Sequence, residues 1–170
     1  LFIAPGNPGM SLYGTCLPRI GVTDFAAIAD LIRREQIKLL VVGPEVPLVE
    51  GIADYLREEA GLKDLLIVGP DARGAQLEGS KDFSKAFMQR YGIPTAGYKT
   101  FGRQSYDEAV DYLKTLRPPY VLKADGLAAG KGVIISEDLE EAQRELRELL
   151  TGRFGEASTR VVIEEYLHGI

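Results

Sequence analysis

The densest group of residues suited to binding phosphate lies in the stretch Lys123-Ala-Asp-Gly-Leu-Ala-Ala-Gly-Lys-Gly132. Its three glycines allow backbone N–H groups to approach an anion closely, and Lys131, which two of them flank, supplies positive charge. A Walker A loop would continue with Ser or Thr and then a helix, whereas here Gly132 and the β-branched run Val133-Ile-Ile135 follow. The stretch is therefore predicted to form a flap over a nucleotide at the tip of a strand pair, with a plain flexible turn as the alternative.

Lys123 favours the phosphate interpretation. It lies inside the apolar, strand-like run Tyr120-Val-Leu-Lys-Ala-Asp125. A lysine there costs free energy unless it faces solvent or a bound anion. An exposed lysine on an edge strand is the competing explanation.

Two further segments carry charged side chains at the ends of elements. The β-run Val161-Val-Ile-Glu-Glu-Tyr-Leu167 ends in two carboxylates, an aromatic ring and a leucine, which can offer backbone groups and an apolar wall to a planar base. In Leu77-Glu-Gly-Ser-Lys81, Ser80 is a candidate helix N-cap, and Lys85 follows Lys81 by one turn on the same face. A solvated strand end and an ordinary helix start are the alternatives.

Composition argues against several classes of function. The 170 residues hold 20 Lys and Arg against 25 Asp and Glu, with no long block of one charge and no Trp, so nucleic-acid binding has little support. No run reaches the roughly 18 apolar residues that span a bilayer. Cys16 and His168, each the only residue of its type, have no partners at the spacing of a metal site or a catalytic triad. We expect a cytoplasmic protein without nucleic-acid or membrane partners.

Apolar periodicity in the first half predicts alternating strands and helices. Strands are expected at 1–4, 37–43 and 65–69. Helices are expected after Thr23-Asp24, a candidate N-cap, and from Leu48 to Leu56. Strands that are apolar throughout are typical of a parallel sheet covered by helices on both faces. The turns Gly43-Pro44 and Gly69-Pro70 follow two of the strands, at the edge where such sheets bind ligands.

The second half predicts a smaller α+β unit. A helix is expected from about Ser80 to Tyr91, with Phe83 and Phe87 on one stripe with Tyr91, and Gly92–Gly102 is expected to be a connection. The order after it is helix, strand, loop, strand, helix and strand, at 105–116, 120–125, 126–132, 133–136, 138–149 and 160–167. A capping box at Ser105-Tyr-Asp-Glu108 and a capped start at Asp138 mark the two helices.

Seven segments, in order, resemble the phosphoribosylamine–glycine ligase (glycinamide ribonucleotide synthetase) family of purine biosynthesis, within the ATP-grasp superfamily. They are Ala4-Pro-Gly-Asn7, Gly21-Val-Thr-Asp24, Val42-Gly-Pro-Glu-Val-Pro-Leu-Val49, Gln76-Leu-Glu-Gly-Ser-Lys81, Ile93-Pro-Thr95, Lys123-Ala-Asp-Gly-Leu-Ala-Ala-Gly-Lys-Gly-Val133 and Val162-Ile-Glu-Glu-Tyr-Leu167. The resemblance spans essentially the whole chain, and the lysine-flanked glycine-rich stretch is its most specific part.

The resemblance implies an α/β fold and an activity. An N-terminal parallel-sheet, Rossmann-like pre-ATP-grasp domain (1–79) would precede the beginning of the central ATP-grasp domain (80–98) and its small α+β lid subdomain (99–170). The implied reaction joins glycine to 5-phosphoribosylamine and gives glycinamide ribonucleotide, ADP and phosphate through glycyl phosphate. ATP and Mg²⁺ or Mn²⁺ are the implied cofactors, and glycine and 5-phosphoribosylamine are the implied small-molecule partners.

The resemblance also assigns site residues. Those implied at the nucleotide are Lys81, Lys123, Asp125, Gly126, Gly130, Lys131, Gly132, Glu164, Glu165 and Leu167. Those implied at phosphoribosylamine are Pro5, Gly6, Asn7, Gly43, Pro44 and Glu45. No catalytic residue and no metal ligand is assigned within the chain; the magnesium ligands are expected beyond residue 170.

The sequence departs from the family at both ends. The glycine-rich substrate loop expected before Leu1–Ala4 is absent, and His168-Gly169-Ile170 stands where many members have an acidic Asp-Gly-Glu run. We therefore expect a fragment of the ligase that is catalytically incomplete alone. Three alternatives stay open: another ATP-grasp carboxylate–amine or carboxylate–bicarbonate ligase, such as a phosphoribosyl-aminoimidazole or biotin carboxylase relative; a non-catalytic nucleotide-binding module; and a structural α/β domain. The segment Val42–Val49 favours the glycine ligase over the first.

Overall fold

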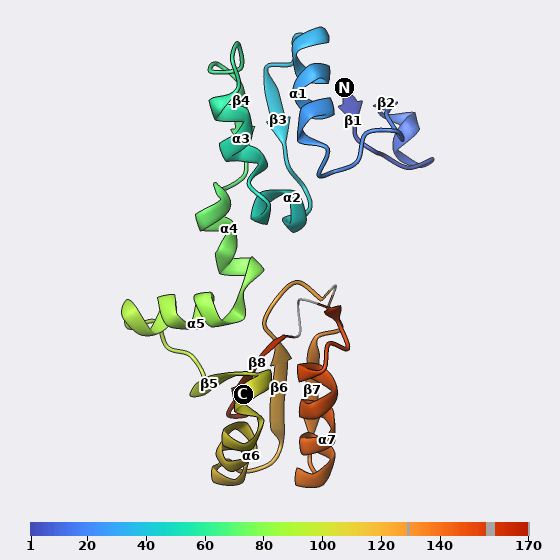
Figure 1. Ribbon diagram of the computed structural model, residues 1–170. Helices are drawn as coiled ribbons and strands as arrows, with labels where there is room; N and C mark the ends of the chain where they lie inside the picture. The colour runs from blue at the N-terminus through green and yellow to red at the C-terminus, as the bar shows by residue number, and fades with distance from the viewer. Residues whose placement is uncertain (129, 156–158, 170) are drawn as a thin grey trace. The chain divides into compact units, whose positions relative to one another are not determined.

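The computed structural model describes residues 1–128, 130–155 and 159–169, which belong to two compact units (Figure 1). Unit 1 is Leu1–Ala75 and unit 2 begins at Gln76. The boundary falls inside α4 (Ala72–Gly79), a helix that the sequence analysis did not predict. Each unit has its own hydrophobic core.

Unit 1 contains two pairs of parallel strands. β1 (Phe2–Ile3) pairs with β2 (Thr15–Cys16), after a short 3-10 helix η1 (Met10–Leu12), and β3 (Leu39–Val41) pairs with β4 (Leu66–Val68). The predicted parallel arrangement of the strands near 37–43 and 65–69 is confirmed. Contrary to expectation, the first strand does not extend this sheet among the described residues but pairs with Thr15–Cys16, which is too short to give a periodic signal.

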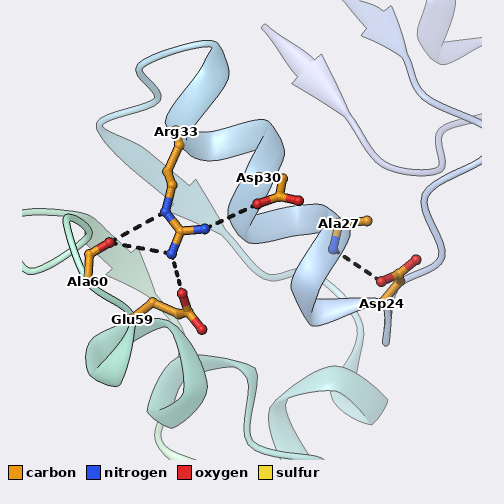
Figure 2. Close-up of polar contacts among 6 residues, drawn as sticks. All are labelled: Asp24, Ala27, Asp30, Arg33, Glu59 and Ala60. Carbon is orange, nitrogen blue, oxygen red and sulfur yellow. Dashed lines mark hydrogen bonds and ion pairs between the residues drawn. The ribbon is translucent and has the colours of Figure 1, made fainter.

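The helices of unit 1 begin and end where side chains satisfy their backbone groups. Asp24 caps α1 (Phe25–Arg34) by accepting the Ala27 N–H at 3.1 Å, as predicted (Figure 2). At the other end of α1, the Arg33 guanidinium pairs with Glu59 and donates to the Ala60 carbonyl at 3.4 Å. This contact ties α1 to the end of α3 (Ile52–Glu58).

The single helix predicted from Leu48 to Leu56 is two helices. α2 (Glu45–Val49) stops before Gly51, whose φ of +91° belongs to the left-handed region, and α3 begins directly after it. The periodic apolar pattern continues across the break, so the pattern alone did not reveal it.

One face of the β3–β4 sheet packs on the core of unit 1, with Leu40 and Ile67 against the apolar sides of α1 and α3. The opposite face is open, and Leu39, Val41, Leu66 and Val68 are 52–67% exposed. The prediction that helices cover both faces is therefore wrong for the structure of these residues. An apolar run shows that a strand avoids water on both faces, but it does not identify the element that covers each face.

Unit 2 is built on a four-stranded antiparallel sheet, as its predicted α+β class requires. Its strands are β5 (Tyr98–Gly102), β6 (Tyr120–Ala124), β7 (Val133–Ser136) and β8 (Arg160–Glu164), in the order β5-β8-β6-β7. The helices α6 (Tyr106–Thr115) and α7 (Leu139–Leu150) share one hydrophobic core with this sheet. The segment Gly92–Gly102, predicted as a connection, contains the strand β5, so that prediction is wrong there. β8 ends at Glu164 and does not continue to Leu167 as predicted.

Three of the helix starts in unit 2 test the capping predictions. Ser80 caps α5 (Lys81–Arg90) by accepting the Phe83 N–H at 3.1 Å, and Asp138 caps α7 by accepting the Glu141 N–H at 2.7 Å. The predicted capping box at Ser105 is wrong, because that side chain makes no capping bond and the 3-10 helix η2 (Arg103–Ser105) leads into α6 instead.

The aromatic stripe of α5 does not lie in the core. Phe83 and Phe87 are each more than one-third exposed and Tyr91 is 61% exposed, whereas Lys85, on another side of the helix, is the buried residue. The inward face of α5 is thus the charged one, which makes this helix the starting point for the site.

Candidate functional site

Alternation along two neighbouring strands puts charged side chains on one face of the unit 2 sheet. Leu122 and Ala124 of β6, like Val161 and Ile163 of β8, belong to the hydrophobic core beneath α6 and α7. Successive side chains in a strand point to opposite faces. Lys123 and Glu164 therefore lie on the face away from that core.

The strand register then makes these two residues diagonal neighbours. Lys123 is opposite Val162, and Val121 is opposite Glu164, in the antiparallel pair of β6 and β8. Long side chains reach across this diagonal, and Lys123 Nζ donates to Glu164 Oε2 at 2.9 Å. Val133 of β7, opposite Lys123, lies on the same face.

Asp125 brings α5 to this face. The backbone carbonyl of Asp125 accepts the Lys81 N–H at 3.1 Å, and its Oδ1 accepts the Asp82 N–H at 2.8 Å and the Ser80 hydroxyl at 3.0 Å. The first turn of a helix leaves N–H groups without partners inside the helix, and here the end of β6 supplies acceptors for two of them. Lys81 is consequently fixed beside the hairpin loop, and its Nζ donates to the Gly126 carbonyl at 3.2 Å.

Between α5 and the sheet lies a cavity of about 280 Å³. Its lining residues come from α4, α5 and three strands: Leu77, Glu78, Lys81, Ser84, Lys85, Met88, Lys123, Val133 and Glu164. Three ammonium groups face two carboxylates there, so the formal charge of the lining is positive. A lining that combines apolar side chains with cations suits a ligand that joins a planar apolar group to an anion.

The environment of Lys81 changes its acidity. Burial lowers the pKa of the Lys81 ammonium, and the charge of Lys123 acts in the same direction, while Asp125 opposes the shift. A bound phosphate would favour the charged form of this lysine, since it would supply the negative charge that the cavity lacks.

The structure places the predicted nucleotide residues in three settings: the wall of the cavity, the β6–β7 loop, and positions away from the cavity wall. Lys81, Lys123 and Glu164 line the same cavity. Gly130, Lys131 and Gly132 lie in the loop between the antiparallel strands β6 and β7, which confirms the predicted strand pair with a loop at its tip. Ala129, within that predicted flap, lies outside the described residues. The contact of this loop with a nucleotide stays a prediction.

Two glycines of the loop have separate structural reasons. Gly130 has a φ of +76°, which other residues rarely adopt. A Cβ at Gly132 would lie 2.7 Å from the Ala128 Cβ and 3.1 Å from the Ala124 Cβ, so this position is packed. The end of the loop is therefore close-packed against β6.

Asp125, Glu165 and Leu167 do not line the cavity. The Asp125 carboxylate is engaged with the start of α5. Glu165 accepts the Gly97 N–H at 2.7 Å and thereby joins the end of β8 to the segment before β5, while Leu167 is 61% exposed. Their roles at a nucleotide remain predictions.

The residues expected at phosphoribosylamine belong to unit 1. Pro5 precedes Gly6, whose φ is +77° and where a Cβ would lie 2.5 Å from Cys16 Sγ, and Asn7 Oδ1 accepts the Met10 N–H at 3.1 Å. Gly43 and Pro44 follow β3 and lead into α2, whose first residue is Glu45. Because β3 and β4 are parallel, this turn and Gly69-Pro70 lie at the same sheet edge, as predicted. The contact of these residues with phosphoribosylamine stays a prediction.

Several lining residues were not assigned to the site from the sequence, and Lys85 is the most informative of them. Its spacing of four from Lys81 was noted as putting both lysines on one helix face, but it was not carried to a site assignment. Leu77, Glu78 and Val133 lie in segments that carry the resemblance, without an assigned role. Ser84 and Met88 carried no signal that set them apart from surface or core positions.

Within 1–128, 130–155 and 159–169, no group of three or more His, Cys, Asp or Glu side chains is arranged to hold a metal ion. The same described ranges contain no helix long and apolar enough to cross a bilayer.

Two family models match the chain. The phosphoribosylglycinamide synthetase N domain matches residues 1–78, and the ATP-grasp (A) domain of the same synthetase matches residues 79–170. Among curated proteins, phosphoribosylamine–glycine ligase of Listeria monocytogenes (strain F2365) is 49% identical over 170 residues, and that of Escherichia coli K12 is 50% identical over 171. Each match covers 99% of this chain, which spans 39% and 38% of the length of these relatives.

Two solved structures are similar to the chain over most of its length. Phosphoribosylamine–glycine ligase of Thermotoga maritima superposes with a TM-score of 0.72 and 33% identity, covering 98% of this chain and 37% of that one. The biotin carboxylase domain of 2-oxoglutarate carboxylase from Hydrogenobacter thermophilus, solved with MgADP and bicarbonate, gives 0.66 and 26%, covering 86% of this chain and 32% of its own.

Proposed function

Because the chain belongs to the phosphoribosylglycinamide synthetase family, we propose that it supplies the nucleotide site of an ATP-dependent ligase that joins glycine to 5-phosphoribosylamine. The products are glycinamide ribonucleotide, ADP and phosphate. The observation that carries this proposal is the cavity in which Lys81 and Lys123 meet Glu164 beside an apolar wall.

The chemistry requires activation of a carboxylate, because an amine does not displace oxide from it. Transfer of the terminal phosphoryl group of ATP to the glycine carboxylate gives glycyl phosphate and ADP, and attack by the amine of phosphoribosylamine then expels phosphate. Negative charge spreads over the transferring group during the first step. The ammonium groups of Lys81 and Lys123 are fixed before the reaction and stabilise that charge without reorganisation.

The apolar part of the wall complements this charged part. Leu77, Met88 and Val133 line the cavity together with the lysines. We assign the base of the nucleotide to these side chains and its phosphates to the lysines, with the β6–β7 loop as the flap over them. The residues in the turns at Gly6 and Gly43 are assigned to the phosphoribosylamine side, from the resemblance alone.

ATP-grasp ligation also uses a divalent cation, which would neutralise phosphate charge. The described residues hold no cluster of three or more His, Cys, Asp or Glu side chains that could bind one. A cytoplasmic location is expected for the pathway.

Calorimetry with MgADP on this chain tests the nucleotide site. Lys123→Met should weaken binding by about 1.5–3 kcal/mol, the value of a hydrogen bond to a charged group, or roughly 10- to 150-fold in Kd. Lys114→Met is the matched control, since it removes an exposed lysine that pairs only with Asp111 of its own helix among the described residues. Absence of MgADP binding, or equal effects of both variants, would refute the site.

The ligase activity needs a longer protein. A chimera in which these residues replace the matched segment of the Escherichia coli relative should release ADP only when both glycine and phosphoribosylamine are present, and Lys123→Met should abolish this release. ADP release that does not depend on glycine would favour another ATP-grasp reaction.

A further inference from the structure

Lys85 is a buried lysine that neither the family resemblance nor the comparisons assign to a role. Only 7% of the residue is exposed. Its Nζ donates to Thr95 Oγ1 at 2.8 Å and to the Ala96 carbonyl at 3.2 Å, and lies 3.2 Å from Glu164 Oε2. A lysine ammonium has three N–H donors. Two of them bond to Thr95 and Ala96, and the ammonium also forms an ion pair with Glu164. Lys85 is therefore engaged mainly by the protein.

Lys123 is in the opposite position. Its side chain is 28% exposed, and its one bond in the described part of the chain goes to the same oxygen, Glu164 Oε2, at 2.9 Å. Two of its N–H donors bond to no other group there. Of the two lysines that share Glu164, Lys123 is the more exposed and has more N–H donors to offer to a molecule in the cavity.

The charges of the three groups explain why two lysines are needed. The Glu164 side chain is only 6% exposed, so its carboxylate must be compensated by cations of the chain. If Lys123 were the only cation beside Glu164, the pair would be neutral. The charge of Lys123 would then be fully compensated by the carboxylate. With Lys85 present, the trio carries one net positive charge, and that charge lies where Lys123 meets the cavity.

We propose that Lys85 is a positioning residue that compensates Glu164 from the protein side and so leaves the charge of Lys123 available to the phosphates of a nucleotide. Lys85 does not touch the ligand. This inference rests on the proposed function, because a nucleotide is the anion that Lys123 receives.

MgADP and adenosine are the two probes that separate this role from a general effect on folding. In Lys85→Met the affinity for MgADP should fall at least tenfold, while the affinity for adenosine, which carries no phosphate, should change less than threefold. NMR titration of the chain measures both. Lys85→Gln can keep hydrogen bonds to Thr95 and Ala96 without the charge, and it should give the same selective loss if Lys85→Met does not fold.

Three further variants complete the test: Thr95→Val, Glu164→Gln, and the double variant Lys85→Met, Glu164→Gln. Thr95→Val removes a hydrogen-bond partner of Lys85 but keeps its charge beside Glu164, so its MgADP affinity should stay within threefold of the unmodified chain even if the variant unfolds at a lower temperature. In the double variant Lys85→Met, Glu164→Gln, the carboxylate no longer competes for Lys123. The loss in MgADP affinity should then be smaller than the product of the two single losses.

The outcomes distinguish the inference from its premise. If the unmodified chain binds no MgADP, the proposed function is overturned. If it binds MgADP and Lys85→Met or Lys85→Gln leaves that affinity unchanged, or lowers the affinities for MgADP and adenosine equally, the inference alone is overturned. Multiplicative losses in the double variant would also overturn it, since they would show that Lys85 does not act through Glu164.

Discussion

Replacing Asp125 with alanine tests the junction that holds α5 on the sheet. Asp125 Oδ1 accepts two hydrogen bonds, from the Asp82 N–H at 2.8 Å and the Ser80 hydroxyl at 3.0 Å, and the residue is 9% exposed. Each bond to a charged group contributes about 1.5–3 kcal/mol, and a carboxylate at a helix N-terminus adds about 0.3–1 kcal/mol. We therefore expect Asp125→Ala to lower the free energy of unfolding of unit 2 by at least about 3 kcal/mol.

Urea denaturation, followed by amide hydrogen exchange in residues 80–91, measures this loss where it arises. Asp138→Ala is the matched control. It removes an exposed N-cap with one bond to the Glu141 N–H and should cost about 1 kcal/mol. Asp125→Asn retains an acceptor oxygen and should fall between the two. If Asp125→Ala costs no more than Asp138→Ala, the junction is not the structural role of Asp125, and the sequence-based assignment to the nucleotide would regain support.

Two other predictions concern the same unit. Gly132→Ala should destabilise it by about 1–3 kcal/mol in urea, because the new Cβ would meet the Ala128 Cβ at 2.7 Å; Gly102→Ala, which meets nothing within 4 Å, is the control, and equal costs would contradict the packing argument. Burial lowers the pKa of Lys81, so between that lowered pKa and the ordinary 10.5 the unfolded chain binds more protons than the folded one. The free energy of unfolding should rise with pH across this window relative to Lys81→Arg, and a flat difference would contradict it.

The sequence singled out both members of the charged pair, Lys123 and Glu164, but did not predict their contact. Lys123 stood out as a charge within an apolar strand, and Glu164 as a carboxylate at the end of another. Both are on the same sheet face, as alternation requires. The order of elements in unit 2 followed from the same periodicity, except for β5, whose residues Tyr98–Gly102 gain their strand conformation from pairing with β8. Pairing with a distant segment leaves no local signal.

The sequence does not show which side of a helix faces the protein interior when both sides carry candidate residues. On α5, Phe83 and Phe87 lie on an aromatic stripe and Lys81 and Lys85 on a charged one. Tertiary contacts turn Lys85 inward, where Glu164 and Thr95 receive its ammonium. The partners lie 79 and 10 residues away, so the compensation of charge appears only after folding. The open face of the β3–β4 sheet in unit 1 shows the same limit of sequence patterns. Apolar residues predict that a face is buried, but they do not identify the element that covers it.

The hydrophobic core of unit 2 enforces the geometry of the site. A one-residue slip of β6 against β8 would turn the side chains of one of the two strands to the other face. Lys123 or Glu164 would then enter the layer now filled by fully buried residues such as Leu122 and Ile163, and the two charges would be separated. The packing of the core therefore also fixes the strand register that brings Lys123 and Glu164 into contact. Lys85 of α5 adds a second cation beside Glu164, so the group of three side chains keeps one net positive charge.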